Sequence, residues 1–194
     1  MKISTTQVLF LTLLLGLSLG LVSLFGGTQQ FLSASEGREI PLADGESSAT
    51  ATFSMYCYWT GEATLGRVPG VLSSRIGHFA GREIVQVDFD PEVTDLVELT
   101  EALKRKKSFY GLLVPDEEAR DSAQSLLEPG DVEVVGGKAR FIEPKHSLRT
   151  RYPEIYALDL TEQQAIALNS WSYFGGPMPQ VLTPEQKQRL KSRR

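Results

Sequence analysis

Between Thr50 and Lys106 the spacing of apolar residues changes several times, and each change predicts a new element. Apolar and polar positions alternate in the first stretch and again just before Pro91, which is typical of strands with one buried face. After Pro91, apolar residues recur at every third or fourth position, which predicts a helix. The predicted order is a strand at Thr50–Cys57, a helix at Thr60–Arg67, strands at Val71–Phe79 and Glu83–Asp90, and a helix at Glu92–Lys106.

The pattern beyond Lys106 is weaker and depends more on turn and cap residues. Gly136-Gly137 between two short apolar runs predicts a β-hairpin of Asp131–Val135 with Lys138–Ile142. This mixed order of strands and helices predicts the α+β class and one domain over residues 49–194. The other elements expected are a helix at Asp116–Leu127, a strand at Glu154–Leu160, a helix at Thr161–Trp171 capped by Thr161, and a helix at Pro184–Lys191.

The N-terminal segment differs from this domain in composition. Val8–Phe25 is apolar and uncharged over about 18 residues, which reaches the lower limit for a membrane span and exceeds the core of most signal peptides. We therefore expect a membrane helix acting as a signal anchor at 1–26, or alternatively a cleaved signal peptide, followed by a flexible tether at 27–48. Lys2 favours a cytoplasmic N-terminus. The domain would then lie outside the cytoplasm, on the periplasmic or cell-surface side, or be secreted after cleavage.

Composition excludes one broad class of function. The chain has 194 residues, 41% of them hydrophobic and 23% charged, which suits one domain with a sizeable core. Its formal net charge is −4, whereas a nucleic-acid-binding surface needs a basic stripe. The basic runs Lys104–Lys107 and Lys191–Arg194 fit a helix C-terminus and a solvated tail. No nucleic-acid partner is therefore expected.

Cys57 is the single cysteine of the chain, so a disulfide within the chain is excluded. It lies among the aromatic residues Tyr56, Tyr58 and Trp59, where a predicted strand gives way to a predicted helix. The partial positive charge of a helix N-terminus favours a thiolate. Two interpretations stay open at this point: an inert buried thiol, or a nucleophile in an aromatic pocket.

The residues around Cys57 resemble a known family. Cys57-Tyr58-Trp59-Thr60-Gly61-Glu62 is similar to the Gly-Cys-Phe-Trp-Gly-x-Glu signature of the A-type peptide methionine sulfoxide reductases. Three further segments resemble this family in the same order: Val68-Pro69-Gly70-Val71, Gly77-His78, and Glu83 to Pro91. The resemblance covers about 55 residues, 50–105. It implies a ferredoxin-like two-layer α/β sandwich.

The same resemblance implies a site that reduces methionine-S-sulfoxide. Cys57 would attack the sulfoxide sulfur, and Glu83 would be the acid that protonates the departing oxygen. Such a reaction also needs an apolar pocket for the methyl group of the substrate and donors for its oxygen. The substrate-binding residues implied are Tyr58, Trp59, His78 and Tyr152.

The reaction would leave a sulfenic acid on Cys57, which a second thiol must reduce. Because the sequence holds no other cysteine, an external reductant such as a thioredoxin-like protein is expected. Neither a cofactor nor a metal is expected, since His78 and His146 have no cysteine cluster to join. The expected function is therefore thiol-dependent repair of methionine-S-sulfoxide, protein-bound or free, in oxidised exported proteins.

Three departures from the family pattern keep other functions open. Tyr56 stands where the family has glycine, the loop before Glu83 is cut to Phe79–Arg82, and the family's Asp-His-Gly-Thr-Gln-Tyr run has no matching aspartate near His146. A non-catalytic binding or assembly module is one alternative. A thiol-based peroxide sensor is another, since it would form the same sulfenic acid.

Overall fold

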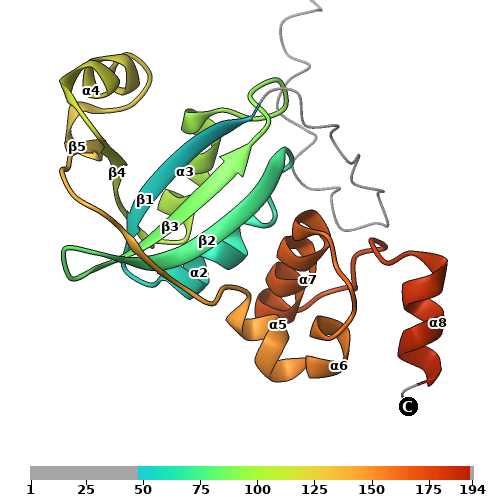
Figure 1. The fold of residues 1–194 in the computed structure, drawn as a ribbon. Coiled ribbons are helices and arrows are strands. Elements are labelled where there is room, and N and C mark those ends of the chain that lie inside the picture. The colour runs from blue at the N-terminus through green and yellow to red at the C-terminus, as the bar shows by residue number, and fades with distance from the viewer. Residues whose placement is uncertain (1–47, 193–194) are drawn as a thin grey trace, which may run out of the picture. The chain divides into compact units, whose positions relative to one another are not determined.

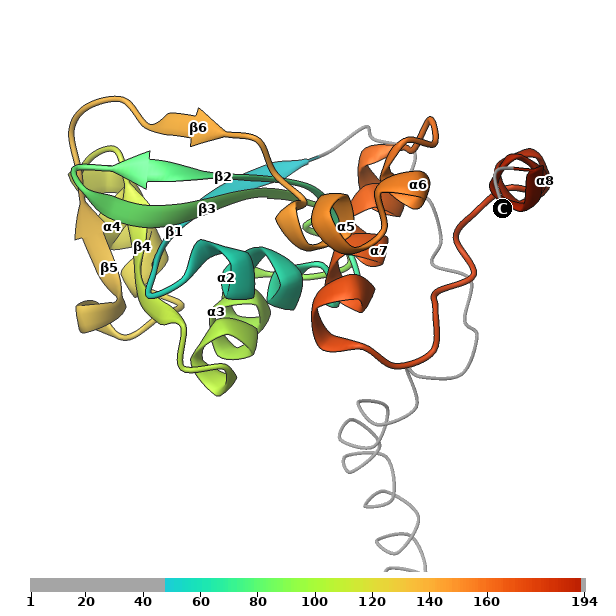
Figure 2. The ribbon, with the colours of Figure 1, turned by 90° about the horizontal axis from the view of Figure 1, so that it is seen from below.

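This computed structural model describes residues 48–192. Its six-stranded sheet has the strand order β5-β4-β1-β3-β2-β6 (Figure 1, with β6 labelled in Figure 2). Neighbouring strands are antiparallel except for β4 and β5, which are parallel. The strands are β1 (Ala49–Met55), β2 (Val71–Phe79), β3 (Arg82–Phe89), β4 (Phe109–Val114), β5 (Val132–Val134) and β6 (Arg140–Ile142).

Helices α2 (Tyr58–Leu65) and α3 (Leu96–Arg105) both lie on one face of this sheet (Figure 2). Together with β1 to β4 they follow the chain order β-α-β-β-α-β, and the four strands are arranged β4-β1-β3-β2. This is the order of the ferredoxin-like motif. The predicted α+β class is therefore confirmed.

The two faces of the sheet have different surroundings, as the alternation in the sequence requires. Phe53 and Val85 are fully buried, stand opposite each other in the β1–β3 register, and belong to the main hydrophobic cluster. The other face carries cross-strand hydrogen bonds between polar side chains, including Thr50 Oγ1 to Asp88 Oδ1 at 2.7 Å. Burial of one face explains why these strands were recognisable from their period of two.

The remaining helices are α4 (Glu117–Gln124), α5 (His146–Arg151), α6 (Pro153–Tyr156), α7 (Glu162–Phe174) and α8 (Pro184–Ser192). A second hydrophobic cluster joins the C-terminal helices around Leu148 and Leu168. Helix α7 also packs on α2, where Ser170 Oγ donates to Ala63 O at 2.6 Å. The predicted cap at Thr161 is confirmed, because its Oγ1 accepts from the Gln164 amide in a capping box.

Two predicted elements are wrong. The expected hairpin at Gly136-Gly137 does not form, because β5 pairs with β4 at one edge of the sheet and β6 pairs with β2 at the opposite edge. The segment expected to form a strand at Glu154–Leu160 begins instead as helix α6. Pro153 is in the first turn of this helix, where a backbone N–H has no partner within the helix, so proline is well tolerated there. Strand β4 and helix α5 were not predicted.

The predicted signal anchor at 1–26 lies outside the described residues, as does the tether at 27–48 up to its last residue. Among the helices of residues 48–192, none combines the length and the apolar character needed to cross a membrane.

Candidate functional site

Cys57 lies where β1 ends and α2 begins. It is the N-cap residue of α2, with φ −143° and ψ 113°, and it is partly exposed. Its carbonyl oxygen accepts from the Gly61 amide at 3.0 Å and from Ser108 Oγ at 3.2 Å, and the Tyr56 amide donates to Ser108 O at 2.9 Å. The cysteine therefore sits at the N-terminus of α2, in a backbone position held by these three hydrogen bonds.

The Glu83 carboxylate lies beside this helix start. Glu83 stands opposite Met55 in β1 and opposite His78 in β2, so the three side chains share the sheet face that carries α2. Its Oε2 accepts a hydrogen bond from the Tyr58 amide at 2.7 Å. This amide nitrogen belongs to the peptide bond that links Cys57 to Tyr58, so the Glu83 carboxylate contacts the backbone directly after the cysteine. The fold thus brings together the predicted nucleophile and the predicted acid.

Four aromatic side chains form a continuous series beside the thiol, here called the ring array: His78, Tyr58, Trp59 and His146. The Tyr58 ring lies 5.5 Å from His78 and 5.6 Å from Trp59, both edge-on, whereas His146 stacks flat on Trp59 at 4.3 Å and 7°. Burial, followed by the negative charges of Glu83 and Cys57, raises the pKa of the Tyr58 phenol above its ordinary 10.0. The charges of Glu83 and Cys57 thus both act on the Tyr58 phenol.

The site differs from the prediction at two residues. His146 was not predicted as a site residue, although both histidines of the chain end in the ring array. Tyr152 lies against Trp171, 4.5 Å between ring centroids, in the second hydrophobic cluster. Its part in binding the sulfoxide oxygen stays a prediction.

Glu62, one turn along α2 from Trp59, is only 1% exposed and has several donors. The Lys145 amide donates to Oε2 at 3.0 Å, Asn169 Nδ2 donates to the same oxygen at 3.1 Å, and Ser74 Oγ donates to Oε1 at 3.1 Å. Burial raises the pKa of the Glu62 carboxyl above 4.5, and the charge of Lys145 opposes this rise. Glu62 therefore joins α2, β2, α7 and the start of α5.

Lys145 is the buried cation of this group. It is 2% exposed, and its Nζ donates to Ser74 O at 2.8 Å and to Glu162 Oε2 at 2.9 Å, with Glu62 Oε1 at 3.8 Å. Its backbone has φ 58°, in the left-handed region where a lysine is uncommon. The tertiary contacts hold the chain in this conformation just before His146.

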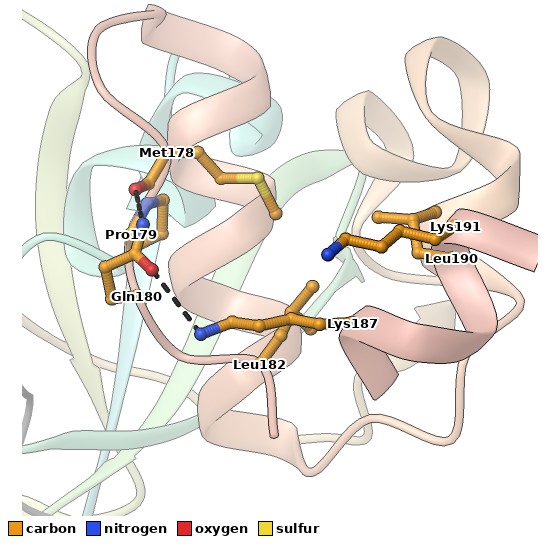
Figure 3. A pocket seen from close by; sticks show the side chains of 7 residues that line it. All are labelled: Met178, Pro179, Gln180, Leu182, Lys187, Leu190 and Lys191. Carbon is orange, nitrogen blue, oxygen red and sulfur yellow. Dashed lines mark hydrogen bonds between the residues drawn. The ribbon is translucent and has the colours of Figure 1, made fainter. Parts of the chain in front are cut away.

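A separate groove of about 240 Å³ lies between α8 and the segment before it (Figure 3). Lys187 reaches across it to Gln180 Oε1 at 3.5 Å. The side chains around the groove offer no thiol and no carboxylate, so it cannot supply the chemistry expected of Cys57. The residues that line it are Met178, Pro179, Gln180, Leu182, Lys187, Leu190 and Lys191.

Comparison with known proteins gives two relatives of one kind. No protein-family model matches the chain. A peptide methionine sulfoxide reductase of Drosophila melanogaster is 27% identical over 131 residues, which covers 61% of this chain and 51% of that protein. The peptide methionine sulfoxide reductase MsrA of Thermoactinomyces vulgaris is 33% identical over 66 residues, covering 25% of this chain and 54% of that protein. The chain thus spans about half the length of the curated relatives it matches.

Proposed function

We propose that this chain, a divergent relative of the A-type peptide methionine sulfoxide reductases, reduces methionine-S-sulfoxide to methionine, with Cys57 as nucleophile and Glu83 as acid. The observation that carries the proposal is the 2.7 Å hydrogen bond from the Tyr58 amide to Glu83 Oε2. It joins the carboxylate to the backbone next to the thiol. The names of the two relatives agree with this chemistry.

The reaction divides between the residues of the site as follows. The Cys57 thiolate attacks the sulfoxide sulfur while Glu83 gives a proton to the sulfoxide oxygen, which makes the oxygen easier to transfer. The sulfur–oxygen bond breaks, the oxygen ends on Cys57 as a sulfenic acid, and methionine is released. The cysteine sulfur is oxidised by two electrons and the methionine sulfur is reduced by two.

Return to the thiol needs two further thiol groups. The first condenses with the sulfenic acid, releasing water and forming a mixed disulfide, and the second breaks that disulfide by exchange. Because Cys57 is the single cysteine in the sequence, both thiols come from outside the chain. A thioredoxin-like dithiol protein supplies both from one molecule.

The exposed position of the site supports access for large partners. Trp59 is 39% exposed and Tyr56 is 70% exposed, so the aromatic surface on either side of Cys57 faces solvent. Tyr56 also lies edge-on to Tyr110 at 6.3 Å. A sulfoxide at the end of a methionine side chain in a protein can therefore enter without a tunnel.

The test is reduction of the two sulfoxide epimers by the full-length chain with dithiothreitol as reductant. The expected result is turnover of the S epimer and none of the R epimer, and loss of turnover in Cys57→Ser. Tyr110→Phe, which leaves the thiol and carboxylate untouched, is the control. If neither epimer is reduced and the Cys57 thiol resists alkylation, the reductase proposal fails and the binding-module alternative is favoured. If hydrogen peroxide oxidises Cys57 rapidly without turnover of the sulfoxide, the peroxide-sensor alternative is favoured.

We also propose that the apolar stretch Val8–Phe25 tethers the enzyme to a membrane, with the domain outside the cytoplasm, where it repairs oxidised exported proteins. The support is the length and uncharged character of this stretch. Fractionation of cells that produce the full-length chain should recover it with membranes, and protease added to intact cells or spheroplasts should digest the domain. Recovery in the cytosolic fraction would refute the tether.

A further inference from the structure

His146 and Trp59 form the one flat stack of the ring array. Their centroids are 4.3 Å apart with 7° between the planes, whereas Trp59 and Tyr58 meet edge-on at 69°. Trp59 is the second residue of α2 and His146 the first residue of α5, so this contact joins two helices far apart in sequence. The imidazole covers one face of the indole. The exposed surface of Trp59 therefore belongs to the other face and the rim.

A second contact between the same two segments lies directly beside the stack. Trp59 and Glu62 are three residues apart on α2 and so lie on one side of that helix. Trp59 contacts His146, and Glu62 accepts two hydrogen bonds from the amide of Lys145, at 3.0 and 3.3 Å. Two residues on one side of α2 thus contact two consecutive residues, Lys145 and His146, which fixes the backbone that carries the imidazole.

The helix that carries His146 is itself fixed to this group. The Leu148 amide donates to Asn169 Oδ1 at 3.0 Å, and Asn169 Nδ2 donates to Glu62 Oε2 at 3.1 Å. All of these groups are buried, where a lost hydrogen bond is costly. Buried polar contacts on either side of His146 therefore hold its backbone beside α2.

We propose that His146 is a substrate-positioning residue, which holds the Trp59 indole by stacking so that the methyl group of the sulfoxide binds on the opposite indole face. The inference rests on the proposed function, because it assigns the free face of Trp59 to that substrate. The interaction energy of such an aromatic stack corresponds to a change in Kd of about 2- to 10-fold. The buried pair Glu62–Lys145 holds the backbone that carries the imidazole.

Binding is measured in the full-length chain with Cys57→Ser, which blocks turnover, and Trp171→Phe, which leaves Trp59 as the single tryptophan. The probe is the S epimer of N-acetylmethionine sulfoxide, followed by Trp59 fluorescence. In this background His146→Ala should raise Kd about 2- to 10-fold and increase acrylamide quenching of Trp59. His146→Phe keeps a flat ring and should stay within about 2-fold of the parent. In the active enzyme, His146→Ala should raise KM and leave kcat within about 2-fold.

The outcomes separate this inference from the proposed function. An unchanged Kd in His146→Ala overturns the positioning role. The role is also overturned if His146→Phe binds as weakly as His146→Ala, because the ring nitrogens, and not the stacking, would then be needed for binding. A parent that does not bind the sulfoxide overturns both proposals. A parent that binds while the Cys57 enzyme fails to reduce overturns the proposed function alone. Should His146→Ala fail to fold, His146→Leu replaces it in the same comparison.

Discussion

Replacing Lys145 by methionine is the sharpest test of how the site is supported. The ammonium is buried, donates to Ser74 O and to Glu162, and lies 3.8 Å from Glu62 Oε1. Methionine has a similar length and no charge, so Lys145→Met removes the cation and retains most of the packing. The Glu62 carboxylate then stays buried with amide and hydroxyl donors alone.

The expected cost follows from that geometry. Two unit charges at 3.8 Å attract by about 4 kcal/mol at an effective dielectric constant of 20. Breaking a buried pair by removing one partner typically costs about 3–5 kcal/mol, because the remaining charge is uncompensated. We therefore expect Lys145→Met to lower the free energy of unfolding by about 3–5 kcal/mol at pH 8. The double variant with Glu62→Gln should recover part of this loss, since no lone charge remains.

The same variant should respond to pH in a definite direction. Burial raises the pKa of Glu62 in the folded state above its ordinary 4.5. The contribution of such a carboxyl to stability is complete below its unfolded-state pKa and is lost as the pH rises through the folded-state pKa. Lys145 opposes the rise in pKa, so its removal raises the folded-state pKa further. The deficit of Lys145→Met should therefore be smaller at pH 5 than at pH 8.

The assay is urea unfolding of the full-length chain at both pH values, followed by circular dichroism, with stability taken from the midpoint and slope. Lys138→Met, at an exposed lysine, is the control and should change stability by less than about 0.5 kcal/mol. A loss below about 1 kcal/mol at pH 8, or a loss of equal size at both pH values, would refute the reasoning.

Three further predictions concern the acid, the sheet and a helix cap. Glu83→Gln keeps an acceptor for the Tyr58 amide but loses the proton, so kcat for the S-sulfoxide should fall about 10²- to 10⁴-fold in the dithiothreitol assay; a fall under 3-fold would exclude the acid role. Gly77→Ala places a Cβ against Arg140 O, where β2 pairs with β6, so it should lower the free energy of unfolding in urea by about 1–3 kcal/mol. Gly136→Ala is the control, since its added Cβ meets no atom within contact distance. Thr161→Ala should cost about 1 kcal/mol by the same measurement and the serine variant much less.

The elements that the sequence predicted well are those whose burial repeats regularly. The predicted strand Val71–Phe79 coincides with β2, and β3 and α3 fall within a few residues of their predicted ends. Strand β4 was missed, since Gly111–Val114 is buried throughout and such a run has no period of two. The hairpin was wrongly predicted because Gly136-Gly137 indicates a turn but does not determine which strands pair. The segments before and after it pair with β4 and β2, at opposite edges of the sheet.

Part of the site was also determined locally. Cys57, Tyr58 and Trp59 are neighbours in sequence at a strand-to-helix junction, so their proximity needs little more than the start of α2. The sequence by itself also provides a single thiol, and the proposed catalytic cycle therefore includes an external reductant. These features follow from composition and local geometry alone.

The tertiary structure decided which distant groups surround that thiol. Glu83 reaches the helix start because the β1–β3 register places it opposite Met55, and a shift of one residue would turn its side chain to the other face. His146 reaches Trp59 because the buried Glu62–Lys145 contact fixes the start of α5, and no pattern along the chain encodes a contact across 87 residues, from 59 to 146. The sequence by itself placed the single thiol at the start of a helix, whereas strand register and the buried Glu62–Lys145 contact determined which distant side chains lie near that helix start.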